Sequence, residues 1–100
     1  MLNVAIEELV DAIKKYQDQS IVVSCNNGMQ VLDGVDVIVD KDIIYLNSDE
    51  GYMEFKICEI GIDNEDIYVD EIEGELHIVF IYDGIKYSIL NLVWYLEMEI

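Results

Sequence analysis

Two five-residue segments, each bounded by aspartates, are the first candidates for chemistry in this sequence. Asp36 and Asp40 enclose the apolar run of DVIVD, and Asp66 and Asp70 enclose that of DIYVD. On a strand, residues four apart face the same side and lie about 13.6 Å apart, at ~3.4 Å per residue. One cation cannot bridge that distance, because calcium–oxygen distances are about 2.3 to 2.6 Å. The sequence therefore predicts neither a metal site in these segments nor a cofactor.

The single histidine, His77, is the other candidate, because an imidazole beside a carboxylate can act in acid–base catalysis. If Glu73-Gly74 forms a two-residue turn, His77 lies opposite Asp70 on the neighbouring strand. A charge pair across an acidic sheet is the simpler interpretation, because no cysteine or serine is marked as a nucleophile beside it. The chain also has no glycine-rich phosphate loop, GxSxG elbow or HExxH helix. The sequence favours a protein that is not an enzyme.

The excess of acidic over basic residues indicates that this protein binds a partner of positive charge. The chain has 22 acidic residues against five lysines and no arginine, which gives a formal charge of −17. A charge of about 2 to 8 suffices to keep a small domain soluble, and the excess costs stability through self-repulsion. Nucleic acid and anionic membranes are held by lysine and arginine rows, so we expect neither as a direct partner. A basic protein surface is the expected partner.

The expected contact residues come from the two aspartate segments and from the most acidic part of the chain. Between Glu59 and Glu75 there are eight carboxylates in seventeen residues and no lysine. Tyrosines add amphipathic contact area of the kind that is enriched at interfaces. The predicted partner-binding residues are Asp36, Ile38, Asp40, Asp63, Glu65, Asp66, Tyr68, Asp70, Glu71, Glu73 and Glu75.

Carboxylates on a rigid sheet could occupy the basic rows that otherwise hold nucleic acid. In charge and size the chain is similar to phage-encoded DNA-mimic proteins such as anti-CRISPR and antirestriction inhibitors. That resemblance implies a small acidic inhibitor that occupies a basic, nucleic-acid-binding surface of another protein. One alternative is an immunity protein that neutralises a cognate basic nuclease toxin, for which the electrostatic argument is the same. Another is an oligomerising structural module, a homodimer formed through a mixed sheet face.

The elements that must position these residues can be read from hydrophobic periodicity. Leu2, Ile6, Leu9, Ile13 and Tyr16 recur at steps of four and three, which predicts an amphipathic helix over residues 3–18. After residue 20 the period becomes two, with Asn-Gly, Asp-Gly and Glu-Gly pairs as turn signals. We expect strands at 21–25, 29–32, 35–39, 43–47, 52–60, 66–72, 75–82, 85–90 and 92–99.

The fold class expected for residues 1–100 is one compact α+β domain. An N-terminal amphipathic helix would pack on a mostly antiparallel, strongly twisted or barrel-like sheet of hairpins, a β-meander over residues 20–100. Two-residue turns at Glu73-Gly74 and Asp83-Gly84 would place apolar residues in common rows. Those rows are Val69, Ile78 and Ile89, followed by Ile67, Phe80 and Tyr87. The other face of these strands is mixed and needs cover, either from barrel closure or from another molecule.

The expected location is the cytoplasm. The N-terminus lacks the basic start and continuous apolar core of a signal peptide. No apolar run approaches the ~20 residues of a membrane span. The two cysteines, Cys25 and Cys58, are far apart and are expected to stay reduced.

Overall fold

The structure is a computed structural model that describes residues 4–17, 19–26, 28–49 and 51–98. Its elements are α1 (Val4–Lys14), β1 (Ile21–Cys25), β2 (Gly28–Leu32), β3 (Asp36–Asp40), β4 (Ile43–Ser48), β5 (Gly51–Lys56), η1 (Ile57–Glu59), β6 (Ile60–Gly61), η2 (Asn64–Asp66), β7 (Ile67–Asp70), β8 (Glu75–Tyr82), β9 (Ile85–Asn91) and α2 (Leu92–Met98). The expected α+β class is confirmed, with a second helix at the C-terminal end.

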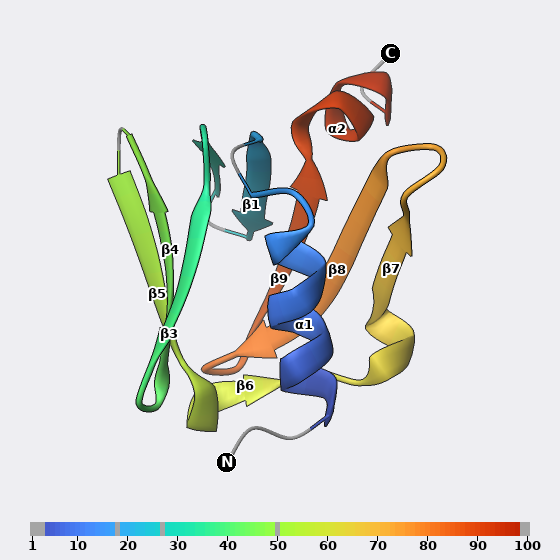
Figure 1. Ribbon diagram of the computed structural model, residues 1–100. Coiled ribbons are helices and arrows are strands. Elements are labelled where there is room, and N and C mark those ends of the chain that lie inside the picture. Colours follow the sequence, from blue (N-terminus) through green and yellow to red (C-terminus); the bar gives the residue numbers. More distant parts are fainter. Residues whose placement is uncertain (1–3, 18, 27, 50, 99–100) are drawn as a thin grey trace.

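The strands form two antiparallel sheets. One has the order β2-β1-β9-β8, with both β6 and β7 paired to the far side of β8, and the other has the order β3-β4-β5. The sheets flank α1, which contacts β3, β7 and β8 (Figure 1). The prediction of a barrel-like meander was wrong, because the sheets do not close on each other and β9 lies between β1 and β8. The Asp33-Gly34 pair is accordingly no hairpin turn; it carries the chain from β2 in one sheet to β3 in the other.

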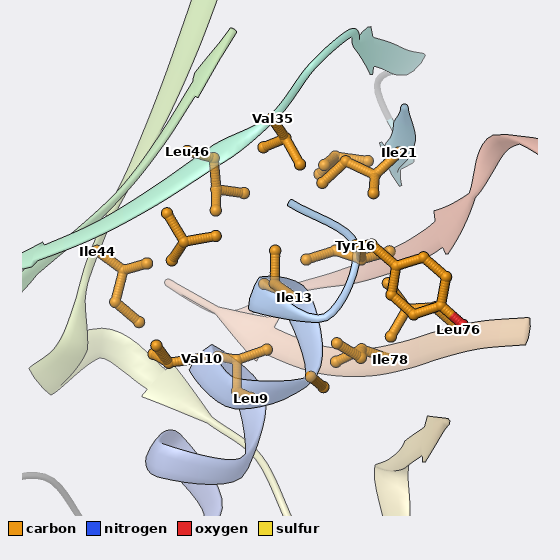
Figure 2. Packing of buried hydrophobic residues seen from close by; sticks show 14 of the residues in the cluster. Leu9, Val10, Ile13, Tyr16, Ile21, Val35, Ile44, Leu46, Leu76 and Ile78 are labelled. Carbon is orange, nitrogen blue, oxygen red and sulfur yellow. The ribbon is translucent and has the colours of Figure 1, made fainter. Parts of the chain in front are cut away.

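Both sheets and α1 contribute to one hydrophobic core (Figure 2). The side chains of Leu9, Val10 and Ile13 on α1 meet Ile44 and Leu46 of β4 on one side and Ile78 of β8 on the other. Glu7 in the first turn of α1 and Lys14 in the last suit the helix dipole. The helix is shorter than expected, since residues 15–17 form a turn in which Tyr16 is still buried. Leu2 lies outside the described residues.

The predicted register is right for one hairpin and wrong for the other. Between β8 and β9, Ile78 pairs with Ile89 and Phe80 with Tyr87 as expected. Between β7 and β8, the pairing is displaced by two residues, so that Ile67 lies opposite Ile78. The cause is a four-residue loop, residues 71–74, where a two-residue turn was expected. A displacement by two keeps each side chain on its predicted face.

Three predicted strands differ from the structure by more than one residue at an end or in type. The strand expected at 52–60 ends at Lys56 and is followed by η1 and β6. The strand expected at 66–72 covers only Ile67–Asp70, because Asp66 ends the 3-10 turn η2. The strand expected at 92–99 is the helix α2, which contacts β1 and β9.

Candidate binding surface

The structure places the two aspartate segments in different sheets. DVIVD is β3 of the three-stranded sheet, whereas Ile67–Asp70 of DIYVD is β7 of the six-stranded sheet. Both inner faces pack into the same core, so their outer faces point away from each other. Ile38 is 43% exposed and Tyr68 is 47% exposed on these outer faces. The predicted residues Asp36, Ile38 and Asp40 therefore do not share a surface with Tyr68 and Asp70.

A different set of carboxylates lies together along α1. The helix contacts both η2 and β7. Ala5 borders one hollow with residues 62–65. Glu8, Asp11 and Lys15 border a second hollow with Ile67 and Val69 of β7. We define the acidic surface as seven exposed carboxylates on α1, in η2 and directly before it, and in the 71–74 loop; they are Glu8, Asp11, Asp63, Glu65, Asp66, Glu71 and Glu73.

The acidic surface has little internal neutralisation. Lys15 Nζ lies 3.4 Å from Glu71 Oε1, and both side chains are about half exposed or more, at 48% and 68%. An exposed pair of this kind contributes only about 0.2 to 1 kcal/mol and is screened by salt. The carboxylates of η2 and the first two turns of α1 therefore remain available to an external cation.

One of the predicted site residues, Asp70, has a structural role in the fold. Asp70 Oδ1 accepts hydrogen bonds from the backbone N–H groups of Ile72 and Glu73, both at 3.1 Å. These bonds form an Asx turn that starts the 71–74 loop. Glu75 lies opposite Asp70 at the start of β8, and both are only partly exposed. Glu71 and Glu73, which the loop carries outward, are the more accessible members of this group.

Burial and the acidic residues near the C-terminal end of α1 raise the pKa of two tyrosines, Tyr16 and Tyr68. Burial raises the pKa of the Tyr16 phenol above its ordinary value, and the charges of Glu71, Asp70 and Glu75 raise that pKa further. The pKa of Tyr68 is raised in the same direction by partial desolvation and by the charges of Asp70 and Glu75. Both phenols stay neutral near pH 7, so neither adds a negative charge beside the acidic surface.

The expected pairing of His77 with Asp70 is wrong. His77 lies opposite Tyr68, because the β7–β8 register is displaced by two residues. Its ring stands edge-on to Trp94 of α2 with centroids 5.4 Å apart, and Tyr68 lies 5.9 Å from the same indole. In the part of the chain that the structure describes, no group of three or more histidine, cysteine, aspartate or glutamate side chains is arranged to hold a metal ion. Cys25 and Cys58 are free thiols.

The outer face of the six-stranded sheet is a second surface, and its composition contrasts with the acidic surface. Along its rows lie Met29 and Val31 of β2, Ser24 of β1, Ser88 of β9 and Val79 and Ile81 of β8. The hydroxyl groups of Ser24 and Ser88 are hydrogen-bonded at 2.7 Å. Val22 and Leu90 are buried on this same face, beneath α2, which contacts their strands. The mixed face is therefore covered in part by α2, a helix of the same chain, and not by the expected barrel closure.

Sequence reasoning missed Glu8 and Asp11 as members of the acidic surface. Their spacing indicates only that they lie on the solvent side of a helix. It does not show that this helix packs beside η2, because that contact joins parts of the chain that are far apart in sequence.

No helix in the described residues is long and apolar enough to cross a membrane. Comparison of the chain with protein-family models, with curated proteins and with solved structures found no match.

Proposed function

We propose that this protein is a small acidic inhibitor that binds a basic, nucleic-acid-binding surface of another protein in the cytoplasm. The observation that supports the proposal is the acidic surface, where α1, η2 and the 71–74 loop bring exposed carboxylates together around the Lys15–Glu71 ion pair. Duplex DNA carries one negative charge per ~1.7 Å of its axis, and proteins bind it through complementary lysine and arginine side chains. The acidic surface offers carboxylates to those same side chains.

The packing beneath the acidic surface suits such a role. Ile6, Leu9 and Ile13 are buried on the inner side of α1, so the helix that carries Glu8 and Asp11 is fixed on the core. A site that is already ordered loses little conformational freedom on binding. A net charge of −17 would also accelerate the encounter with a positively charged partner. The proposal predicts fast association that slows as salt is added.

The test is capture of a partner on the immobilised protein at low salt, followed by affinity measurement with the purified partner. We expect the captured protein to bind duplex DNA and to lose that binding when this protein is added. The variant Asp63→Asn/Glu65→Gln/Asp66→Asn/Glu71→Gln should bind at least about tenfold more weakly, equal to about 1.4 kcal/mol, with a flatter salt dependence. These four substitutions remove exposed carboxylates without adding bulk.

The matched control removes the same charge from the three-stranded sheet. In Asp36→Asn/Asp40→Asn/Asp42→Asn/Glu54→Gln, the changes lie in β3, in the turn after it and in β5. This variant should keep most of the affinity. Equal losses in the two variants would show that net charge alone governs binding and would contradict the assignment of the acidic surface. A partner that binds this protein and DNA at the same time would contradict inhibition by occupancy.

A further inference from the structure

The free edge of β2 is a feature that the proposed function does not use. β2 pairs with β1 along its whole length, from Gly28 opposite Cys25 to Leu32 opposite Ile21. No described strand pairs with its other side, so β2 forms one end of the six-stranded sheet. Its sequence, GMQVL, has no charged residue, and Met29 and Val31 are 53% and 39% exposed.

The other sheet edges carry features that oppose pairing with another chain. β3 has aspartates at both ends, and β5 contains Glu54 and Lys56. β7 has four residues and ends at Asp70, and β6 has only two residues. Charged side chains and short length are the usual means by which soluble proteins protect their sheet edges. Among the described edge strands of more than four residues, β2 alone lacks a charge.

We propose that β2 pairs antiparallel with β2 of a second copy of this chain, which joins two six-stranded sheets across a two-fold axis. If the pairing is centred on Gln30, Met29 of each copy lies opposite Val31 of the other, and no charged side chains meet within the paired strands. The same arrangement at β3 would place Asp36 opposite Asp40. The uncharged sequence of β2 therefore makes this edge self-complementary.

The absence of charged residues in β2 favours a second copy at this edge over a basic partner. A basic protein gains most from the carboxylates, and β2 offers none. The acidic surface lies beside β7, at the opposite edge of the same sheet. A dimer through β2 would keep the two acidic surfaces apart and leave both accessible.

Added salt should strengthen this dimer, whereas it should weaken the complex with a basic partner. Two copies of charge −17 repel each other, and salt screens that repulsion. In sedimentation equilibrium, the mass should rise from 11.5 kDa toward twice that value with protein concentration. The dimer dissociation constant should fall at least about tenfold between 50 mM and 1 M NaCl. A mass that stays at one copy across this range, at concentrations up to 1 mM, would overturn the proposal.

Two lysine variants with the same change of charge locate the contact. Val31→Lys places a charge on the β2 edge, and Ile81→Lys places one on the outer face of β8, where the side chain is 44% exposed. Val31→Lys should weaken dimerisation at least about tenfold although it lowers the net repulsion, whereas Ile81→Lys should have little effect. The reverse result would show that the sheets pack face to face and would overturn pairing at the edge.

Hydrogen exchange on the unmodified protein provides a test that does not depend on a variant folding. At high salt and high concentration, backbone amides in residues 28–32 should exchange more slowly than in the dilute protein, because new interstrand hydrogen bonds protect them. Amides of β3, an edge in the other sheet, should be unchanged. Slower exchange in β3 with no change in residues 28–32 would contradict the proposed contact.

Discussion

At the scale of single residues, Asn91 organises the loop that carries part of the acidic surface. Its side chain is buried, with 5% exposed. Asn91 Oδ1 accepts a hydrogen bond from the Leu76 N–H at 3.0 Å, and Nδ2 donates one to the Gly74 carbonyl at 2.7 Å. One amide thus satisfies two backbone groups at the point where the 71–74 loop enters β8. Buried backbone groups without partners are costly, so this side chain defines the end of the loop.

We predict that Asn91→Ala lowers the free energy of unfolding by about 1 to 3 kcal/mol. The substitution leaves the Leu76 N–H and the Gly74 carbonyl without their partner, and the penalty is that of an unsatisfied buried polar group. Urea denaturation followed by circular dichroism measures the loss. Asn64→Ala in η2 is the control, because Asn64 is exposed. Equal stability of the two variants would show that water replaces the amide at no cost.

The sequence contained only part of the information about individual residues. Asp83-Gly84 formed the expected turn, with φ of 50° and 79°, because this turn type depends on two adjacent residues. Asn91 gave no signal, since its partners lie 15 and 17 positions away and are backbone groups of β8 and of the loop before it. Similarly, nothing local showed that the Asp70 carboxylate would accept two backbone N–H groups and lengthen the 71–74 loop.

At the scale of elements, α2 shows where strand periodicity misled. Leu92, Trp94 and Leu96 alternate with Asn91, Val93 and Tyr95, which is the pattern of a strand. In the helix, Leu92, Trp94 and Tyr95 are partly buried, and Val93 and Leu96 are exposed. The outer face of β1 and β9 presents Val22 and Leu90, and a helix folded back from β9 buries both. Packing against β1 and β9 therefore makes this segment a helix, although its local sequence has the alternating pattern of a strand.

We predict that Trp94→Ala lowers the free energy of unfolding by about 1 to 3 kcal/mol. The indole is half-buried and contacts the rings of Tyr68 and His77, so its loss falls below the ~3 to 5 kcal/mol of a fully buried tryptophan. Thermal unfolding by circular dichroism measures the change. Val93→Ala in the next position is the control, because Val93 is 65% exposed. A larger loss in Val93→Ala than in Trp94→Ala would contradict the observed orientation of α2.

At the scale of the whole molecule, composition predicted the net charge but not which carboxylates lie together on one surface. The carboxylates of η2 and of the 71–74 loop come to lie beside α1, because η2 contacts that helix and Glu71 pairs with Lys15. Asp36, Ile38 and Asp40 lie on the outer face of the other sheet, because β3 belongs to a separate three-stranded unit. The number of carboxylates comes from the sequence, whereas their grouping depends on long-range sheet order.

The same grouping should make stability depend on salt. Like charges held close together in the folded state repel one another, and the repulsion weakens as the Debye length falls from about 30 Å at 0.01 M to about 3 Å at 1 M salt. We predict that the melting temperature rises by about 4 to 8 °C between 10 mM and 500 mM NaCl, which corresponds to about 1 kcal/mol for a domain of this size. Measurements on Val31→Lys keep dimerisation through β2 from contributing to the rise.

Two variants that each lack four carboxylates test whether the salt effect comes from repulsion within the acidic surface or from the net charge of the molecule. The variant Asp63→Asn/Glu65→Gln/Asp66→Asn/Glu71→Gln should melt higher than the unmodified protein at 10 mM NaCl and should gain less from added salt. The equally charged variant Asp36→Asn/Asp40→Asn/Asp42→Asn/Glu54→Gln should show a smaller effect, because Lys41 and Lys56 lie in the same sheet region and offset its carboxylates. Choline chloride should act as NaCl does, since screening does not depend on the cation. A rise in NaCl alone would indicate specific sodium binding and contradict the electrostatic explanation.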